Sequence, residues 1–176
     1  MLYRSVLTVA GSPQNVELLD CSGQELKDEV LEWAEAFVIV YSITDRSSLV
    51  LTKATLHTLT YKRPEAPVMI TGNKSDLGHQ RQVTEAEGRL LAQNHDAKYF
   101  EMSAAEDSDS VSVAISSFLK EVKVYRSKAS PRYRKLSPTK LISSLVCRYS
   151  PAQNSTQLIV LDKNEQAKLP SKPTHL

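Results

Sequence analysis

Residues 16–25 read VELLDCSGQE, and the predicted fold is organised around this stretch. Its mostly apolar beginning is typical of a buried strand, which ends in the carboxylate of Asp20 before a short polar turn that closes on Gly23 and Gln24. In open α/β sheets, ligands bind just beyond the carboxyl ends of the strands. The stretch therefore predicts a carboxylate and a bare backbone N–H at the ligand-binding edge of a sheet.

The charges of the chain are unevenly distributed. The 176 residues are enough for one domain with a sizeable core, and their net charge is only +2. Residues 120–148, however, contain nine Lys or Arg and one acidic residue, Glu121, so this segment carries +8 and the remainder carries −6. This pattern predicts an acidic body with a basic arm.

The two cysteines, Cys21 and Cys147, lie far apart and have neither metal-binding nor redox spacing. No signal peptide or bilayer-length apolar run is visible, so we expect a reducing, cytoplasmic environment. The last residues, 173–176, read PTHL and do not form a prenylation box. Any peripheral membrane contact is therefore expected to be electrostatic.

Strand-like and helix-like segments alternate through residues 1–125, which we interpret as one domain. Strands are predicted at 2–10, 14–19, 37–41, 68–72 and 99–102, and helices at 25–35, 45–61, 84–92 and 111–122. The first two strands resemble an antiparallel hairpin, and the alternation after them predicts a three-layer α/β fold with a mostly parallel sheet.

Residues 126–176 lack this periodicity and are rich in Ser, Pro, Lys and Arg. We predict a basic, mostly disordered tail. Within it, residues 158–161 (Leu-Ile-Val-Leu) are interpreted as either an extra strand or a docking segment.

The segment Asn73-Lys74-Ser75-Asp76 directly follows a predicted buried strand. Its carboxylate can accept hydrogen bonds from ring N1–H and exocyclic N2–H₂ of guanine, a pair of donors that adenine does not offer. Such a site discriminates, because the wrong base leaves a buried carboxylate unpaired. The Lys74 stem can cover the base and Asn73 can connect neighbouring loops, so the segment predicts a guanine-binding loop.

A second small turn, Ser103-Ala104, follows the next predicted strand and lets backbone N–H groups approach a base oxygen. The three segments 20–24, 73–76 and 103–104 thus occur in order, each directly after a strand. Their order and context favour one nucleotide site at the carboxyl edge of the sheet.

Together these segments resemble the motifs of the Ras-like small GTPases over about residues 3–125, and residues 37–45 and 81–87 are similar to that family too. The missing lipid box and the basic tail resemble the non-prenylated branch around the estrogen-regulated growth-inhibitor type. The resemblance implies a P-loop NTPase-like fold and a monomer that binds GTP/GDP with Mg²⁺. It also implies slow GTP hydrolysis and signalling through effector and regulator proteins.

The resemblance also implies a role for each matching residue. Asp20 would reach Mg²⁺ through water, the Gly23 N–H would meet the γ-phosphate, and Gln24 would orient the attacking water. The residues implied to hold guanine are Asn73, Lys74, Asp76, Ser103 and Ala104.

The sequence departs from the family at several places. Cys21 and Ser22 stand where Thr-Ala is usual, and Ala105 stands where a Lys usually covers the base, which predicts weaker affinity. No stretch matches G-x-x-x-x-G-K-[ST], so the family's first strand, phosphate loop, first helix and switch-I Thr have no counterpart. In the family that strand lies inside the sheet, beside the strand that ends at Asp20. We therefore expect a truncated gene model, isoform or fragment with marginal stability on its own.

Two alternatives to a working GTPase stay open: a nucleotide-impaired interaction module and a fragment without catalysis. For the tail, a solvated segment is the default, and adhesion to anionic membranes or RNA is the alternative. Specific DNA binding is not expected. Phosphorylation at the Ser-Pro pairs of Ser130, Ser137 and Ser150 would lower the tail's charge.

Overall fold

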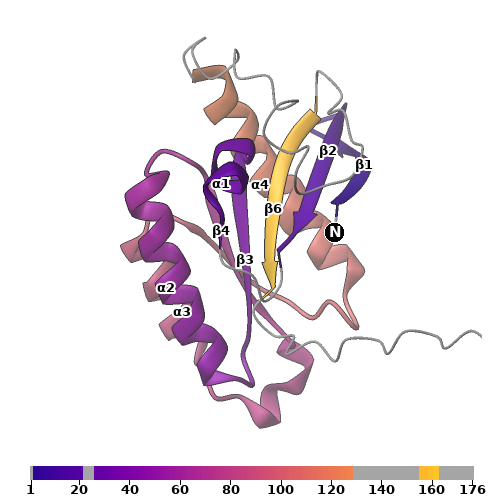
Figure 1. Ribbon diagram of the computed structural model, residues 1–176. Helices are drawn as coiled ribbons and strands as arrows, with labels where there is room; N and C mark the ends of the chain where they lie inside the picture. Colours follow the sequence, from indigo (N-terminus) through magenta and orange to yellow (C-terminus); the bar gives the residue numbers. More distant parts are fainter. Residues whose placement is uncertain (1, 22–25, 129–154, 163–176) are drawn as a thin grey trace, which may run out of the picture.

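The computed structural model describes residues 2–21, 26–128 and 155–162, and its elements follow the predicted alternation (Figure 1). In chain order they are β1 (Leu2–Val9), β2 (Ser12–Asp20), α1 (Asp28–Trp33), β3 (Ala36–Ser42), α2 (Arg46–Lys62), β4 (Val68–Asn73), the 3₁₀ helix η1 (Ser75–Gln80), α3 (Glu85–Asn94), β5 (Lys98–Glu101), α4 (Ser108–Lys128) and β6 (Ser155–Asp162). The predicted strands and helices of residues 1–125 are all present, and the α/β fold class is confirmed.

The strands of the described residues form one six-stranded sheet in the order β1-β2-β6-β3-β4-β5. Only β1 and β2 are antiparallel, and every other neighbouring pair is parallel. The strand β6 comes from the predicted tail, so of the two interpretations of residues 158–161 the extra strand is confirmed. The rest of that tail, residues 129–154 and 163–176, lies outside the described residues.

The hairpin between β1 and β2 closes through two residues. Ala10 and Gly11 both have positive φ (50° and 76°), and Val9 pairs with Ser12. Two central residues with positive φ make the type I′ turn, whose twist matches that of paired strands. The sequence pattern predicted the turn over 11–13, but Ser12 and Pro13 already belong to β2 because this turn needs only two residues.

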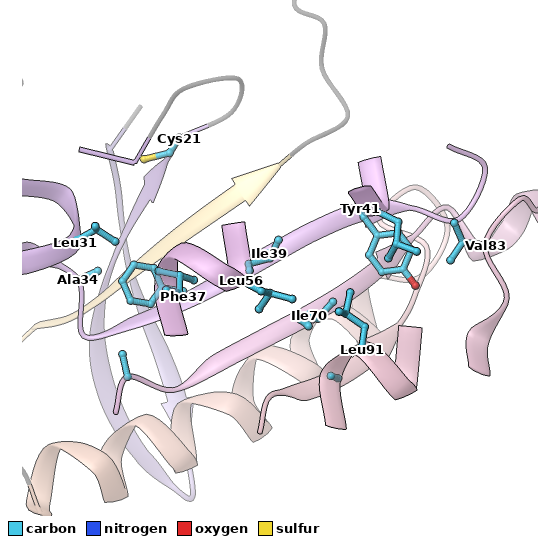
Figure 2. Close-up of a cluster of buried hydrophobic side chains, with 14 of the residues drawn as sticks. Cys21, Leu31, Ala34, Phe37, Ile39, Tyr41, Leu56, Ile70, Val83 and Leu91 are labelled. Atoms are coloured by element: carbon cyan, nitrogen blue, oxygen red, sulfur yellow. The ribbon is translucent and has the colours of Figure 1, made fainter. Parts of the chain in front are cut away.

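Helices cover both faces of the sheet, and β3 shows how one strand serves two cores. Phe37, Ile39 and Tyr41 point into a cluster with residues of α2 and α3, as Figure 2 shows. The alternate residue Val38 packs with Phe118 of α4 on the opposite face. The four β3 side chains, at positions 37, 38, 39 and 41, are each at most 2% exposed, as expected for a strand buried on both faces.

No helix within residues 2–21, 26–128 and 155–162 combines the length and apolar character needed to cross a bilayer.

Candidate functional site

Described residues from all three sequence motifs lie at one edge of the sheet. The strands β2, β6, β3, β4 and β5 are parallel, so their carboxyl ends share that edge. Asp20 is the last residue of β2, Asn73 is the last residue of β4, and Ser103 follows the end of β5 by two residues. The fold therefore brings together segments separated by more than eighty residues, at the position where α/β sheets bind ligands.

The side chain of Asn73 joins the loops after β4 and β5. Its Oδ1 accepts hydrogen bonds from the backbone N–H of Lys74 (2.8 Å) and from that of Ala104 (3.0 Å). A further bond runs from the N–H of Ser75 to the carbonyl of Met102 (3.3 Å). Two acceptor lone pairs on one amide oxygen thus hold the N-K-x-D loop against the Ser-Ala turn, as the sequence predicted for Asn73.

Lys74 has a left-handed backbone, with φ 69° and ψ 38°. Left-handed backbone is uncommon for a residue with a Cβ, and residues held in it cluster at ligand-binding loops. Here it lets the chain leave β4 and turn directly into η1, which begins at Ser75. The Lys74 side chain is exposed, so it is available to cover a flat ligand at this edge.

Asp76 contains an unpaired buried acceptor. Its Oδ1 is shielded from solvent, and no hydrogen bond to it is formed by the residues that the structure describes. A buried acceptor without a partner costs about 1–3 kcal/mol, and more when it is charged, so native proteins rarely keep one without a reason. A ligand with two adjacent N–H donors would remove this cost, and the guanine edge has that pair.

The turn after β5 is compact. Ser103 is 4% exposed, its Oγ accepts from the N–H of Glu106 (3.2 Å), and its carbonyl accepts from the N–H of Asp107 (3.0 Å). The Asp107 carboxylate then accepts hydrogen bonds from the hydroxyl of Ser110 and from its N–H (2.8 Å) at the start of α4. The bond from the hydroxyl is the main cause that lowers the pKa of Asp107, and the bond from the N–H adds to it. Since Ala104 N–H is already bonded to Asn73, a base oxygen would share or displace that bond, or meet a neighbouring amide.

Asp20 lies at the far side of the site. The strands β6 and β3 separate β2 from β4, and three strand spacings amount to about 14–15 Å. One extended ligand is therefore needed to contact both Asp20 and Asp76. Mg²⁺ typically binds one or two carboxylates together with waters and phosphate oxygens, so a single half-buried Asp fits such an ion.

Two predicted residues, Gly23 and Gln24, belong to the segment 22–25 outside the described residues. Among the residues that are described, no group of three or more His, Cys, Asp or Glu side chains is arranged to hold a metal ion. A cation at Asp20 would thus depend on oxygens from water or from the ligand.

The sequence patterns did not predict a polar network that lies at the end of β5. Arg81 pairs with Glu101 through both of its terminal nitrogens, Tyr99 donates to Glu101 (3.2 Å), and the hydroxyls of Tyr41 and Tyr99 lie 3.0 Å apart. Hydrogen bonding from Arg81 is the main cause that lowers the pKa of Glu101. The network supports the end of β5, from which the Ser-Ala turn starts. No local pattern links Arg81 to a residue 20 positions away.

Comparison with known proteins agrees with these motifs. Residues 2–124 match the Ras family. The Ras-related and estrogen-regulated growth inhibitor-like protein of Bos taurus is 35% identical over 158 residues, which cover 82% of this chain and 78% of the relative. Its Homo sapiens namesake is 35% identical over 133 residues, covering 69% and 65%. Ras-like protein family member 12 of Danio rerio is 38% identical over 128 residues, covering 69% of this chain and 50% of that relative.

Proposed function

The chain belongs to the Ras family of small GTPases, and from this premise we propose that it binds GDP and GTP at the carboxyl edge of its sheet. The proposal rests above all on Asp76, whose buried and unpaired Oδ1 needs a donor. A guanine base would supply ring N1–H and exocyclic N2–H₂ to this carboxylate. The Lys74 stem would cover the base, while Asn73 would hold the two surrounding loops in place.

Hydrolysis of GTP is the second part of the proposal. Mg²⁺, when bound, would neutralise charge that develops on the phosphates. Asp20 would hold that ion through a water molecule, from its place at the end of β2. Gln24 would orient the attacking water and Gly23 N–H would meet the γ-phosphate, both by resemblance to the family. Slow turnover and signalling through switch loops are proposed by the same resemblance.

Base selectivity tests the first part. Calorimetric titration of the 176-residue protein is expected to show tighter binding of GDP than of ADP. In Asp76→Asn, the side chain offers one acceptor and one donor, which match N1–H and O2 of xanthine instead of the two donors of guanine. We expect this variant to lose its preference for GDP and to bind xanthosine diphosphate better than the parent does.

Asp96→Asn is the matched control, because Asp96 is exposed on the loop before β5 and is distant from the carboxyl edge. Its selectivity should equal that of the parent. Equal affinity of the parent for GDP and ADP would contradict the proposed guanine-nucleotide binding. A variant Asp76→Asn that keeps the parent's preference would sink the role of Asp76.

A nucleotide-impaired interaction module is the second candidate, and one observation favours it. The strand β6 occupies the sheet position between β2 and β3, and the residues that follow it, 163–166, read KNEQ without a glycine. A phosphate-cradling loop needs close backbone approach, which glycine permits. Comparing guanosine with GDP separates the candidates: equal affinities favour the module, and a gain from the phosphates and Mg²⁺ favours the GTPase.

The partners and location of the protein are proposals as well. We propose a cytoplasmic monomer that contacts effector and regulator proteins and adheres weakly to anionic membranes through residues 120–148. Sedimentation with vesicles of phosphatidylcholine alone, or with added phosphatidylserine, tests the adhesion. Binding that depends on phosphatidylserine and falls with salt is expected.

A further inference from the structure

The strand β6 is the only described strand that connects the N-terminal hairpin to the rest of the sheet. It pairs with β2 from Asn15↔Ser155 to Asp20↔Val160 and with β3 from Ala36↔Leu158 to Val40↔Asp162. In this sheet β2 and β3 are not hydrogen-bonded neighbours. Figure 1 shows β6, drawn in yellow, lying between them although it comes from the far end of the sequence.

The two strands that flank β6 are built for an interior position. Val16 and Glu17 of β2 are each 1% exposed, and Phe37 and Ile39 of β3 are 0% exposed. Without β6, both strands would present unpaired backbone N–H and C=O groups in the middle of the domain. Such groups destabilise the fold when they are buried, and they pair with strands of other chains when they are exposed.

The sequence of β6 suits an interior strand. Its residues 158–161 form a continuous apolar run, which is typical of parallel strands covered on both faces. The flanking tail is basic and polar, so the run stands out from the rest of residues 129–176. The 26 residues between α4 and β6 can reach the slot with ease, because a fully extended chain of that length spans about 85–90 Å.

We propose that β2 and β3 form a strand-binding slot and that its occupant is the chain's own segment Ser155–Asp162. The occupant enters parallel to both neighbours, so it pairs with every β2 position from Asn15 to Asp20. It thereby completes the domain and fixes the backbone at Asp20, on the edge that carries the candidate site. The C-terminal tail is then a structural part of the domain, and a tether of 26 residues favours insertion into the same molecule.

Two truncations of the 176-residue protein test the proposal. Ending the chain after Asp162 keeps β6, and we expect its urea midpoint and amide protection to match those of the full chain. Ending it after Asn154 removes β6, and we expect loss of the cooperative transition together with loss of amide protection in β2 and β3. Equal midpoints and equal protection in the two truncations would overturn the proposal.

A peptide and a point variant keep the test decisive if the shorter truncation fails to fold. Adding a synthetic peptide of residues 155–162 to that truncation should restore amide protection in β2 and β3, whereas a scrambled peptide should not. In the full chain, Ile159→Pro removes a ladder donor from a central strand and should lower the midpoint, whereas Gln166→Pro, beyond β6, should not. Rescue by the scrambled peptide, or equal midpoints for the two proline variants, would contradict the slot.

A full-length chain that is dimeric, with a midpoint that rises with concentration, would show that the occupant comes from a second copy and would overturn the assignment.

Discussion

Asn73 shows how one side chain can organise a binding edge. Its Oδ1 holds the backbone N–H of Lys74 and of Ala104, so both loops depend on a single acceptor. We expect Asn73→Ala to lower the free energy of unfolding by about 1 kcal/mol, since it removes two exposed hydrogen bonds whose donors can bond to water instead. Urea denaturation measures the change. Asn73→Asp keeps an acceptor oxygen at this position and should lie close to the parent, whereas an unchanged Asn73→Ala would contradict the role.

Gly88 is a second single position with a large expected effect. A Cβ there would lie 2.6 Å from Cε2 of Tyr99, inside the contact distance of two carbons. Alanine gains about 0.8–1 kcal/mol of helix propensity over glycine, but overpacking of a core costs about 1–3 kcal/mol. The difference between these two contributions predicts that Gly88→Ala destabilises the protein by up to about 2 kcal/mol in thermal or urea denaturation.

Gly78→Ala is the matched control for this substitution. A Cβ at Gly78 would meet nothing within 4 Å, and its φ is not in the left-handed region. Its stability should equal or slightly exceed that of the parent. Equal losses in the two variants would mean that crowding against Tyr99 is not the cause.

At the scale of elements, the start of α3 combines a capping box with a link to α2. Thr84 Oγ1 accepts from the N–H of Glu87 (3.2 Å), and Glu87 Oε2 accepts from the N–H of Thr84 (3.0 Å). Arg46 of α2 donates to the other carboxylate oxygen (2.6 Å). This bond from Arg46 is the largest of the causes that lower the pKa of Glu87 to about 2.

The lowered pKa of Glu87 has a defined pH dependence. A carboxyl group whose pKa is lower in the folded state stabilises that state above its ordinary pKa of 4.5, and this contribution is lost as pH falls from there to about 2. An NMR titration of the Glu87 carboxyl should therefore give a midpoint near 2. In Arg46→Gln the pKa of Glu87 should rise toward its ordinary value. Lys53 is exposed on α2, so in Lys53→Gln the pKa of Glu87 should equal that of the parent. Identical pKa values in Arg46→Gln and the parent would contradict the link.

The local sequence was sufficient to predict most helices and strands and the order in which the site motifs follow them. The period of apolar residues located β3 and β4 to within one residue, and N-K-x-D and Ser-Ala fell after strands as predicted. The helix α4 begins three residues before and ends six residues after the predicted range 111–122. Topology needed the tertiary structure, because nothing in residues 158–161 says that they insert beside Asp20. The pairing of Arg81 with Glu101 was likewise invisible, since each partner lies in a segment whose own pattern is already explained by a turn or a strand.

At the scale of the whole molecule, the hydroxyls of Tyr41 and Tyr99 lie where β3, β5 and α3 converge. Figure 2 shows Tyr41 within the apolar cluster, between Ile39 and Val83. Burial is the main cause that raises the pKa of both phenols above the ordinary value of 10.0. The hydrogen bond between the two hydroxyls raises the pKa of Tyr99 further.

These raised pKa values predict a loss of stability at high pH. Above about pH 10 the unfolded chain releases the two phenolic protons while the folded chain keeps them, so the folded state binds more protons and the free energy of unfolding falls as pH rises. Urea midpoints measured between about pH 8 and 11.5 should therefore decline along the alkaline limb. Tyr99→Phe removes one of the two groups, so its decline should be shallower even if the lost hydrogen bond to Glu101 lowers its stability at every pH. Tyr61→Phe, at a side chain that is 83% exposed, should decline as steeply as the parent. Parallel limbs for Tyr99→Phe and the parent would show that the phenol of Tyr99 does not cause the loss, because an offset that is independent of pH cannot change the slope.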